Sequence, residues 1–506
     1  MYFFKLIGAL TIKPYSFKAR SWEYTSLNSI DFFDSMASNT KIEIRGRQVL
    51  RVLPRQNDQI NETWITDRAR FGLDSLNIQR IGSFIKNNIK SLMTLPIFIQ
   101  YMGLELLLFF FFKKHEKISN RSIIGYVDSL ISSETLIFFK DFLTNLGSSN
   151  MWSSLSMSYN FSKNLDRSFY IFRNNLSLLN SELCFFIGFN PRLENPIFNL
   201  KMRKHFLKNK IQIFSFTPIN NPNFDIQFLG NSVNAFLRFC EGRHTFVSYL
   251  FNYKSSVFLL GNSIMYRRDI FLFFSLLTKL LTFIPKSSFY FVYNKLNDIL
   301  ISEYGFLPSK FSKHLNNLNK SSNLIFNLSS VNLNPIRSKE SMDYIKYIEW
   351  AKRDINVFLG TFGFNALKFY DYVFPLTNIL EVGGTFLSLT GVKSNVPLAS
   401  VPFRNTFDFY VFYTMLFRYL NHFNFFMLSN ITFSKLLRLN QLGVFDPIFS
   451  KNFAITPMFY LNGSLNKNII NVIHVNSFII NEYTLNSPLL SKAKKLYSNS
   501  FSTSYF

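Results

Sequence analysis

The sequence predicts an α/β fold of doubly wound, mostly parallel sheets, with a small β-hairpin domain near its N-terminal end. Three largely apolar runs, at residues 183–187, 257–260 and 355–359, each end at a glycine and precede a helix-sized segment. Such runs are typical of strands covered on both faces, and their alternation with helices favours parallel sheets. Residues 41–53 instead alternate in a two-residue period around a glycine, which favours a hairpin.

The predicted hairpin begins with Ile42 and Ile44 on one face of its first strand. Residues 45–47, Arg-Gly-Arg, form the turn, and residues 48–53 form the second strand. Pro54 ends this strand, because proline has no N–H to donate to a ladder.

Residues 81–90 are predicted to form a short basic helix, and a long apolar run follows at residues 92–112. The run is long enough to span a membrane, but Pro96, Gln100 and Glu105 interrupt it. A charge at the bilayer centre costs ~2.5–3.5 kcal/mol on insertion scales. We therefore favour a buried helix followed by a buried strand, with a membrane span as the alternative.

The clearest βαβ unit begins with a strand at residues 183–188. Asn195 can cap the next helix, and Pro196 suits its first position. The helix is expected at residues 197–208, and the second strand at residues 211–216.

Further elements follow the same alternation. A strand is expected at residues 122–126, and Ser132 with Glu134 suits the start of a helix. Helix-sized segments are also expected at residues 268–281 and from Asn365.

Two polar stretches lie outside this pattern. Residues 310–339 are rich in Asn and Ser, so we predict a loop or linker there. Residues 467–506 are predicted to be a tail that lies on the surface or on a partner.

Ligands of doubly wound sheets bind beyond the carboxyl ends of the strands. Here these positions are residues 188–191, 261–263 and 360–363. Their glycines could bring a phosphate close to backbone N–H groups, or they could simply form tight turns. We favour the turns, because the sequence has neither GxGxxG nor a Walker lysine.

Residues that carry common catalytic chemistry are sparse. Cys184 and Cys240 are the only cysteines, neither belongs to a CxxC motif, and Cys184 is predicted to be a buried core thiol. The six histidines are scattered, and neither HExxH nor GxSxG is present. We therefore predict no catalytic, cofactor-binding or metal-binding residues in this chain.

The net charge of +25 could reflect an anionic partner such as nucleic acid or a membrane surface. It could also reflect AT-rich codons, which favour Lys, Asn, Ile and Phe, and we prefer this explanation because most lysines are dispersed. The densest basic cluster suits one helix face and comprises Lys201, Arg203, Lys204, Lys208 and Lys210. An AT-rich gene indicates an organellar genome.

A resemblance to a known family rests first on residues 371–376, Glu381, residues 383–386 and Gly391. They read DYVFPL, E, GGTF and G, and resemble the DVxLP…E…GTF…G pattern of molybdopterin oxidoreductases. In that family the pattern forms a strand end and a loop near the pterin pocket. The resemblance implies a multi-layer, formate dehydrogenase-like α/β fold.

Residues 8–23 and 51–71 narrow the resemblance through the segments GALT, KPY, RVLPR and NETWI. They resemble the large iron–sulfur subunit (75 kDa type) of respiratory complex I, which is NADH:ubiquinone oxidoreductase. Residues 188–199 and 259–269 are also similar to that subunit, and residues 483–493 are faintly similar.

One departure from this family concerns its iron–sulfur clusters. There the clusters lie in a region before GALT that ends in a cysteine, whereas Lys5 stands at that position here. A cluster needs cysteine thiolates, usually four of them. We therefore expect the chain to lack the N-terminal cluster-binding half, and a separate chain to supply it by docking on residues 1–80. Trp22 and Arg55 are expected to serve that docking.

The resemblance implies four parts of the chain. Residues 1–27 would form the seam to the separate iron–sulfur half. Residues 28–80 would form a small cysteine-free domain resembling the 4Fe-4S domain of Mo/W bis-MGD-type enzymes. Residues 81–450 would form the molybdopterin-oxidoreductase-like α/β domain, and residues 451–506 a C-terminal tail.

The function that the resemblance implies is that of a structural, non-redox part of the subunit. It would support electron transfer from NADH to ubiquinone in the matrix-facing peripheral arm of mitochondrial complex I, without a cofactor of its own. Its partners would be the cluster-bearing half and the flavoprotein and quinone-module subunits, but not nucleic acid. The alternatives are a stand-alone molybdopterin- or nucleotide-dependent oxidoreductase and a basic organellar RNA-binding protein.

Overall fold

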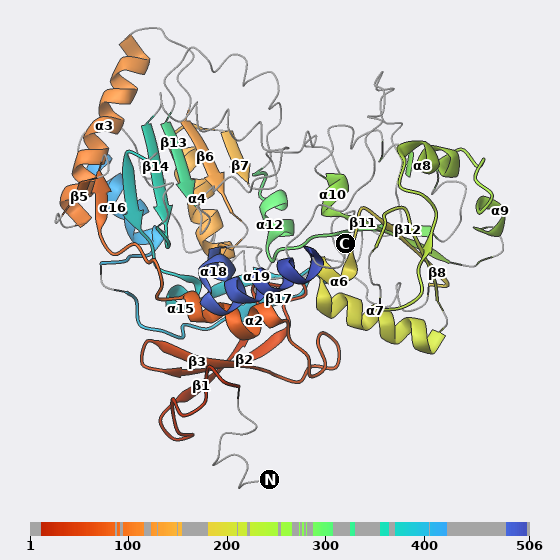
Figure 1. Cartoon of the computed structure of the whole chain (residues 1–506). Helices are drawn as coiled ribbons and strands as arrows, with labels where there is room; N and C mark the ends of the chain where they lie inside the picture. The colour runs from red at the N-terminus through yellow and green to blue at the C-terminus, as the bar shows by residue number, and fades with distance from the viewer. Residues whose placement is uncertain are drawn as a thin grey trace.

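The computed structural model describes three units built on separate sheets (Figure 1). The described residues are 12–86, 89–91, 95–115, 123–128, 130–148, 150–153, 181–209, 211–219, 223–250, 253, 255–265, 273, 276–277, 280, 287–306, 324–328, 355–363, 370–403, 405–421 and 482–502. The expected helix at residues 268–281 and the helix start at Asn365 lie largely or wholly outside them.

The first unit is a three-stranded antiparallel sheet in the order β1-β2-β3. Its strands are β1 (Thr25–Ile30), β2 (Asn39–Arg45) and β3 (Gln48–Pro54). The hairpin prediction is confirmed, including the end of the second strand at Pro54. The sequence analysis missed β1, whose first half is exposed and polar, and this strand crosses the expected boundary at residue 27.

A short helix, α2 (Asp67–Phe71), and the 3₁₀ turn η1 (Gly72–Ser75) cover the small sheet. Thr66 caps α2, since its hydroxyl accepts a hydrogen bond from the Ala69 N–H at 3.1 Å. Ile42 and Val52 of the sheet pack into one core with Leu73 of η1. We call residues 12–80 the small domain.

Residues 81–90 do not form the predicted helix. They contribute β4 (Phe84–Lys86) and β5 (Ile89–Ser91), an antiparallel pair at one edge of the second sheet. Ile85 of β4 pairs with Val373, and Phe84 packs against Phe98. These tertiary contacts override a local pattern that favours a helix.

The long apolar run forms one helix, α3 (Leu95–His115), so the predicted strand in its second half is wrong. The run has no glycine or proline after Gly103 that would end the helix. Gly103 lets α3 approach Tyr419 of α16 (Phe409–Asn421). Among the helices that the structure describes, none is long and apolar enough to cross a membrane.

The second unit is a seven-stranded sheet in the order β5-β4-β15-β14-β13-β6-β7. The strands not yet introduced are parallel to one another: β6 (Ile123–Val127), β7 (Asn150–Ser153), β13 (Leu324–Leu328), β14 (Ile355–Gly360) and β15 (Tyr372–Pro375). The strand order reverses between β6 and β13, which makes the sheet doubly wound. The helix α4 (Ser133–Asn145) begins after Ser132, as predicted.

β13 lies within residues 310–339, which were predicted to be a loop or linker. Its sequence, Leu-Ile-Phe-Asn-Leu, is a short apolar run inside a polar stretch. All five of its residues are buried, because the strand sits between β14 and β6. The prediction of a loop is therefore wrong at this point.

The third unit is a parallel five-stranded sheet in the order β10-β9-β8-β11-β12. Its strands are β8 (Leu183–Ile187), β9 (Gln212–Ser215), β10 (Gln227–Phe228), β11 (Ser256–Gly261) and β12 (Ser287–Val292). Its helices are α6 (Pro191–Glu194), α7 (Pro196–Asn209), α8 (Val233–Cys240), α9 (Val247–Leu250), α10 (Asn262–Met265) and α12 (Asp298–Glu303). The predicted unit of β8, α7 and β9 is confirmed.

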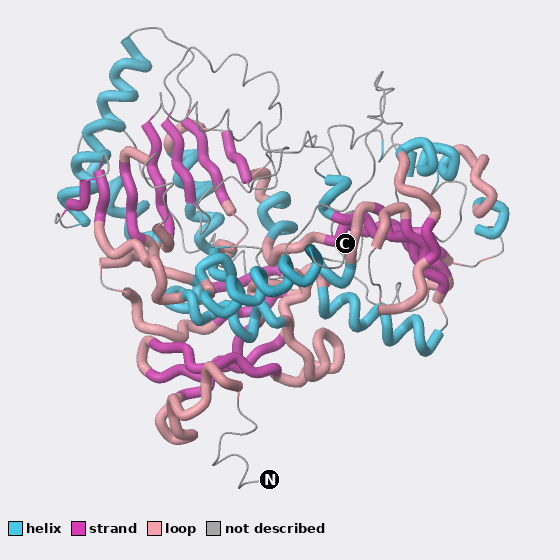
Figure 2. Tube along the Cα trace, in the orientation of Figure 1, coloured by secondary structure: helices cyan, strands magenta, loops and turns pink. Residues whose placement is uncertain are grey.

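The remaining elements join the units (Figure 2). They are α15 (Ile379–Val382), the antiparallel pair β16 (Gly384–Leu387) and β17 (Lys393–Val396), α18 (Glu482–Asn486) and α19 (Pro488–Ser502). The helix α18 is not merely draped on the surface, because Tyr483 is buried among the rings of Phe32, Phe33 and Phe362.

In the five-stranded sheet, the backbone that follows β8 is in direct contact with the end of the neighbouring strand β11. A Cβ added at Gly261 would overlap the carbonyl group of Gly188 and the backbone of Phe189. The Ser263 hydroxyl donates a hydrogen bond to that Gly188 carbonyl at 2.5 Å. Glycine at position 261 therefore allows a close approach between two backbone segments.

We expect Gly261→Ala to lower the free energy of unfolding by about 3 kcal/mol, which is the upper end of the usual cost of overpacking. The cost is high because the added methyl group meets backbone atoms, which cannot move aside as a flexible side chain can. Gly242→Ala is the matched control, since Gly242 has a φ of +80° but nothing within 4 Å of the added Cβ. Its cost should be about 1–2 kcal/mol from the left-handed backbone alone. Urea unfolding measures both, and equal losses would contradict this account.

Candidate functional site

The strand-order reversal of the seven-stranded sheet, where this class of fold binds ligands, holds a small cavity. Its volume is about 60 Å³, and it lies beyond the carboxyl ends of β13 and β14. The lining is mostly apolar, with polar groups from the segments after β6 and β15. These polar residues are Ser132, Thr135, Thr361, Thr377, Asn378, Asp408 and Tyr483.

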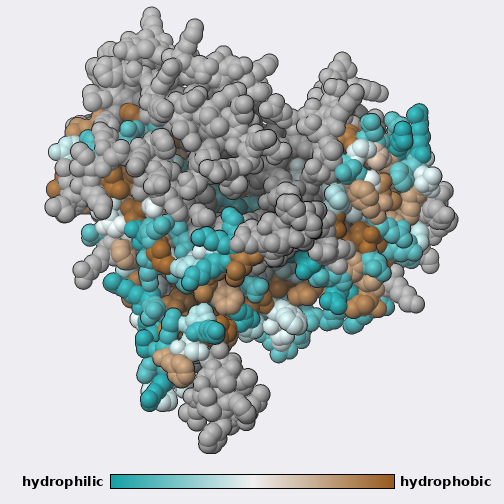
Figure 3. Space-filling model, in the orientation of Figure 1, coloured by the Kyte–Doolittle hydropathy of each residue, from teal (hydrophilic) through white to brown (hydrophobic). Residues whose placement is uncertain are grey.

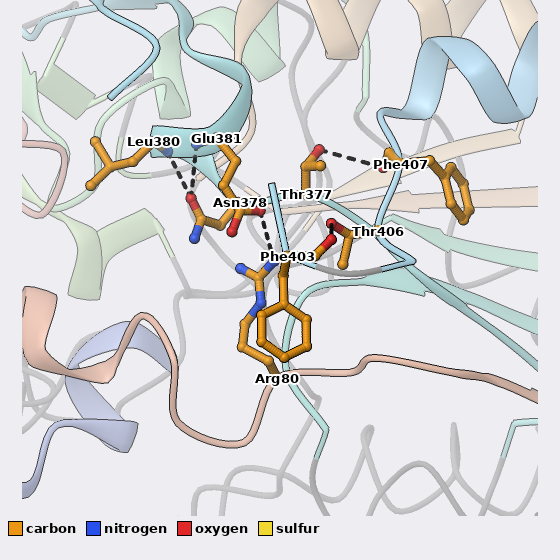
Figure 4. Close-up of polar contacts among 8 residues, drawn as sticks. All are labelled: Arg80, Thr377, Asn378, Leu380, Glu381, Phe403, Thr406 and Phe407. Carbon is orange, nitrogen blue, oxygen red and sulfur yellow. Dashed lines mark hydrogen bonds and ion pairs between the residues drawn. The ribbon is translucent and has the colours of Figure 1, made fainter. Parts of the chain in front are cut away.

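The loop after β15 is held by a capping box at the start of α15 (Figure 4). The Asn378 side chain accepts hydrogen bonds from the N–H groups of Leu380 and Glu381 at 2.8 and 3.1 Å. In return, Glu381 Oε2 accepts from the Asn378 N–H at 2.9 Å. Three backbone donors at the helix start are thereby satisfied.

Glu381 also forms a buried ion pair that joins the small domain to this loop. Arg80 Nη2 lies 2.7 Å from Glu381 Oε2, and the Arg80 side chain is 1% exposed. The guanidinium also lies 6.0 Å from the ring centroid of Phe362 and 5.7 Å from that of Phe403. Figure 4 shows the Phe403 ring beside Arg80, with the guanidinium directed at Glu381.

A second segment closes the other side of the loop. The Phe407 carbonyl accepts hydrogen bonds from the N–H and hydroxyl of Thr377 at 3.1 and 3.4 Å. Asp408, the next residue, lines the cavity, and burial raises the pKa of its carboxyl group. The ion pair of Arg80 with Glu381 and the hydrogen bonds of Thr377 thus brace the loop after β15 from two sides, and we call these contacts the brace.

The residues of the GGTF stretch also serve contacts within the chain. The carboxylate of Glu134, in the first turn of α4, accepts hydrogen bonds from the Thr385 N–H at 3.1 Å and from its hydroxyl at 2.6 Å. A Cβ at Gly384 would overlap Ser132. This stretch therefore fixes β16 to α4.

The predicted ligand positions fall on two different sheets. Residues 188–191 and 261–263 meet at the centre of the five-stranded sheet, whereas residues 360–363 belong to the seven-stranded sheet. Asn190 uses its side chain to accept from the Arg192 N–H at 3.2 Å. The strand-to-helix turns favoured from the sequence are thus observed after β8, where α6 begins at Pro191, and after β11, where α10 begins at Asn262. The segment that follows residues 360–363 lies outside the described residues.

A buried polar network joins the small domain and the five-stranded unit to the segment after β16, a strand that is fixed to α4 of the seven-stranded unit. The Ser35 hydroxyl donates to Asn195 Oδ1 at 3.0 Å, and Asn195 Nδ2 donates to the Tyr293 carbonyl at 3.0 Å. The Leu389 N–H donates to the Ser35 carbonyl at 2.7 Å. We call these four residues the three-unit junction. Asn195 was predicted to cap α7, but its side chain is used here instead.

Charged groups surround the three-unit junction. Asp34, Arg68 and Glu194 are buried, and Arg68 Nη2 donates to the Glu194 carbonyl at 3.3 Å. The carboxylate of Asp34 has no hydrogen-bond partner among the described residues. Burial, and then the neighbouring Asp31, raise the pKa of Asp34 to about 7. Burial raises the pKa of Glu194 to about 8.

Two residues of the basic cluster on α7 are also used within the chain. Lys201 Nζ donates to the Gln59 carbonyl, and Lys204 forms an ion pair with Glu62. These two lysines therefore attach α7 to the small domain.

The part of the chain that the structure describes has no group of three His, Cys, Asp or Glu residues placed to hold a metal ion. Burial raises the pKa of the Cys184 thiol, as expected for a core residue, and it raises that of Cys240 to about 12. Both thiols are therefore poor ligands in this fold.

The sequence analysis named Trp22 and Arg55 as docking residues. Trp22 is exposed, whereas Arg55 is half-buried and its N–H donates to the Asn39 carbonyl at 3.0 Å. The sequence analysis missed Arg80, Asp34 and Arg68, because the groups that they approach are distant in the sequence. Arg80 and Glu381, for example, are 301 positions apart.

Residues 108–402 match the family described as Molybdopterin oxidoreductase. Residues 24–74 match the family described as NADH-ubiquinone oxidoreductase NDSU1/NuoG-like, 4Fe-4S domain. The expectation that the chain lacks the cluster-binding half was therefore too broad. A domain of the 4Fe-4S type is present, although residues 24–74 contain no cysteine.

Two mitochondrial-type relatives are similar to this chain. The NADH-ubiquinone oxidoreductase 75 kDa subunit of Reclinomonas americana is 36% identical over 279 residues, which cover 52% of this chain and 39% of the relative. The iron-sulfur protein 1 of NADH dehydrogenase [ubiquinone] from Solanum tuberosum is 32% identical over 265 residues, covering 52% and 35%. The chain thus spans about two fifths of the length of these relatives.

Among solved structures, Acetylene Hydratase from Pelobacter acetylenicus has a similar fold. The TM-score is 0.54 with 11% sequence identity, and the match covers 78% of this chain and 69% of that chain. This likeness confirms the predicted α/β architecture.

Residues 24–74 do not fit the iron–sulfur cluster that the second family match implies. A 4Fe-4S cluster requires cysteine thiolates, and these residues contain none. At the crevice of the seven-stranded sheet, the described residues leave a cavity of about 60 Å³, whereas small-molecule sites commonly measure roughly 300–1,000 Å³.

We expect Glu381→Gln to lower the free energy of unfolding by about 3–5 kcal/mol, because it leaves the buried Arg80 charge uncompensated while keeping an oxygen for the cap. Glu23→Gln is the matched control, because it removes the exposed pair with Arg45. It should cost less than about 1 kcal/mol. Urea denaturation of both variants tests this, and a similar small loss in both would contradict the brace.

We expect Asp34→Asn to raise the free energy of unfolding, by an amount that increases with pH. The folded-state pKa of about 7 lies above the usual value of 3.8 for an aspartate, so the folded state binds the proton more tightly and the parent chain loses stability as pH rises from about 4 to 7. Asparagine removes this loss. The variant should therefore be more stable than the parent at pH 8, by a few kcal/mol at most, and by less than half of that gain at pH 5.

Asp58→Asn is the control for the pH series, because Asp58 is exposed and lies in the same domain. Thermal unfolding between pH 5 and 8 measures the difference for both variants. A gain for Asp34→Asn that does not change over this range would contradict the raised pKa.

Proposed function

The chain belongs to the molybdopterin oxidoreductase family and is a homologue of the 75 kDa subunit of NADH-ubiquinone oxidoreductase, and on this premise we propose that it is a structural, non-redox part of that subunit. It would act in the peripheral arm of complex I, where it supports electron transfer from NADH to ubiquinone. The enzyme activity belongs to the whole complex, and this chain contributes no catalytic residue, cofactor or metal ligand to it.

One observation carries this proposal: the cysteine-free domain of the 4Fe-4S type is fixed to both α/β sheets by buried contacts. Arg80 pairs with Glu381 of the seven-stranded unit, and Ser35 bonds to Asn195 of the five-stranded unit. A domain without cluster ligands has no redox use for such attachment. Rigid attachment does serve a scaffold, because electron tunnelling falls steeply with the distance between centres.

The partners in this proposal are the cluster-bearing part of the same subunit and the flavoprotein and quinone-module subunits. The location would be the matrix face of the mitochondrial inner membrane, and the AT-rich composition supports a mitochondrial gene. The boundaries at residues 27, 80 and 450 complete the proposal. Strand β1 and the domain match from residue 24 support a small domain that begins near the first of them.

The test is native electrophoresis of detergent-solubilised mitochondrial membranes, with an in-gel assay of NADH oxidation and mass spectrometry of each band. We expect peptides of this chain to comigrate with NADH-oxidising activity in a large complex. A chain that migrates apart from that activity would rule out the proposal.

Metal and cofactor analysis separates this function from the alternatives. The purified full chain should contain no molybdenum, pterin or stoichiometric iron, and it should release RNA at moderate salt. Stoichiometric molybdenum with pterin would support a stand-alone oxidoreductase instead. Salt-resistant retention of RNA would support an RNA-binding protein.

A further inference from the structure

Two aromatic side chains project into solvent from the segment that precedes β1. Phe17 is 86% exposed and Trp22 is 74% exposed, the two highest values among the large hydrophobic residues that the structure describes. We call this pair the aromatic ledge. Figure 1 shows the segment, in dark red, beyond β1 on the side of the small sheet that faces away from α2 and the α/β units.

The segment that carries the aromatic ledge is held firmly to the small sheet. Arg45 Nη1 donates to the Lys18 carbonyl at 3.1 Å and to Glu23 Oε2 at 3.2 Å. The buried Tyr15 ring lies under the guanidinium of Arg51, whose Cζ is 4.1 Å from the ring centroid. Tyr15 also donates through its hydroxyl to the Ala19 carbonyl at 3.3 Å. The ledge is therefore presented by an ordered segment and not by a loose end.

The backbone at Phe17 is strained. Its φ is +60°, a left-handed conformation that a bulky residue rarely adopts. Such strain costs of order 1–3 kcal/mol and persists where surrounding contacts enforce it, often at binding surfaces. Here the contacts on either side of Phe17 hold a large apolar ring in water, where it gains nothing from burial within this chain.

The surroundings of the ledge are strongly basic. The ledge segment and the adjacent hairpin turn contribute five cations, Lys13, Lys18, Arg20, Arg45 and Arg47, against one carboxylate, Glu23. That carboxylate is already paired with Arg45. The Cζ atom of Arg20 lies 5.4 Å from the Trp22 ring centroid, which places charge directly beside the apolar surface.

We propose that the aromatic ledge is the anchor by which the small domain docks on a partner protein whose facing surface is acidic and has apolar pockets for two rings. Aromatic residues beside arginine are the side chains enriched in the energetic centres of protein interfaces. The hydrophilic surface around the small domain in Figure 3 matches the polar rim of such an interface. The identity of the assembly rests on the proposed function, but the ledge and its charge do not.

The first experiment compares oxidative footprinting of the full chain in its native assembly and after dissociation from it. We expect Trp22 oxidation to fall at least tenfold in the assembly. Phe228, 55% exposed on the edge strand β10, is the control and should react equally in both states. Zero-length carbodiimide cross-linking should join Lys13 or Lys18 to a carboxylate of another protein.

The second experiment compares Trp22→Ser with Phe228→Ser in the full chain. The ledge variant should lower affinity for the isolated partner at least tenfold and leave the salt dependence of binding unchanged, because it removes no charge, while the control should change neither affinity nor salt dependence. Thermal unfolding of each free chain verifies that it is folded. A folded Trp22→Ser chain with unchanged affinity would overturn the proposal.

The two proposals fail in different ways. If the chain does not comigrate with NADH-oxidising activity but Trp22 is protected and cross-linked in another assembly, the ledge stands and the proposed function fails. If Trp22 reacts equally inside and outside the complex I assembly, the ledge fails and the proposed function stands. Binding of the ledge to anionic lipid vesicles in place of protein, or a chain that is monomeric under native conditions, would also overturn the ledge.

Discussion

The amide of Asn195 is the contact on which the arrangement of the three units depends. Its oxygen accepts from Ser35 of the small domain, and its nitrogen donates to Tyr293 in the five-stranded unit. Ser35 in turn accepts from Leu389, which follows β16. All of these groups are buried, so losing one partner would leave a desolvated polar atom at a cost of about 1–3 kcal/mol. Any other relative placement of the units would break these hydrogen bonds, so the network favours the placement that is observed.

The crevices that serve ligands in doubly wound folds are used here for internal contacts. In the five-stranded sheet, the backbone after β8 packs directly on Gly261, and Ser263 bonds to Gly188. In the seven-stranded sheet, the loop after β15 binds Arg80 through Glu381. The strand-end loops and their glycines are thus used for contacts within the described part of the chain.

The sequence predicts the buried parallel strands well, because strands covered on both faces leave unbroken apolar runs such as that of β8. It predicts poorly the elements whose formation depends on distant partners. One end of β1 is exposed and polar, so this strand has no clear apolar pattern. β4 forms by pairing with β15, and β13 is a short apolar run within a polar stretch. The three-unit junction was invisible for the same reason, since Ser35 and Asn195 are 160 residues apart.

The small domain divides its polar residues between two tasks. On its inner side, carboxylates such as Asp34 are buried beside Arg68, and the raised pKa keeps charge low where it would be costly. On its outer side, Lys18 and Arg20 remain in water beside Trp22. Packing within the chain thus explains why the inner residues are placed as they are, but it does not explain the position of Lys18, Arg20 and Trp22. These outer residues are of the types found in protein interfaces, as we expect for a domain that is fixed to the α/β units on one side and binds a partner on the other.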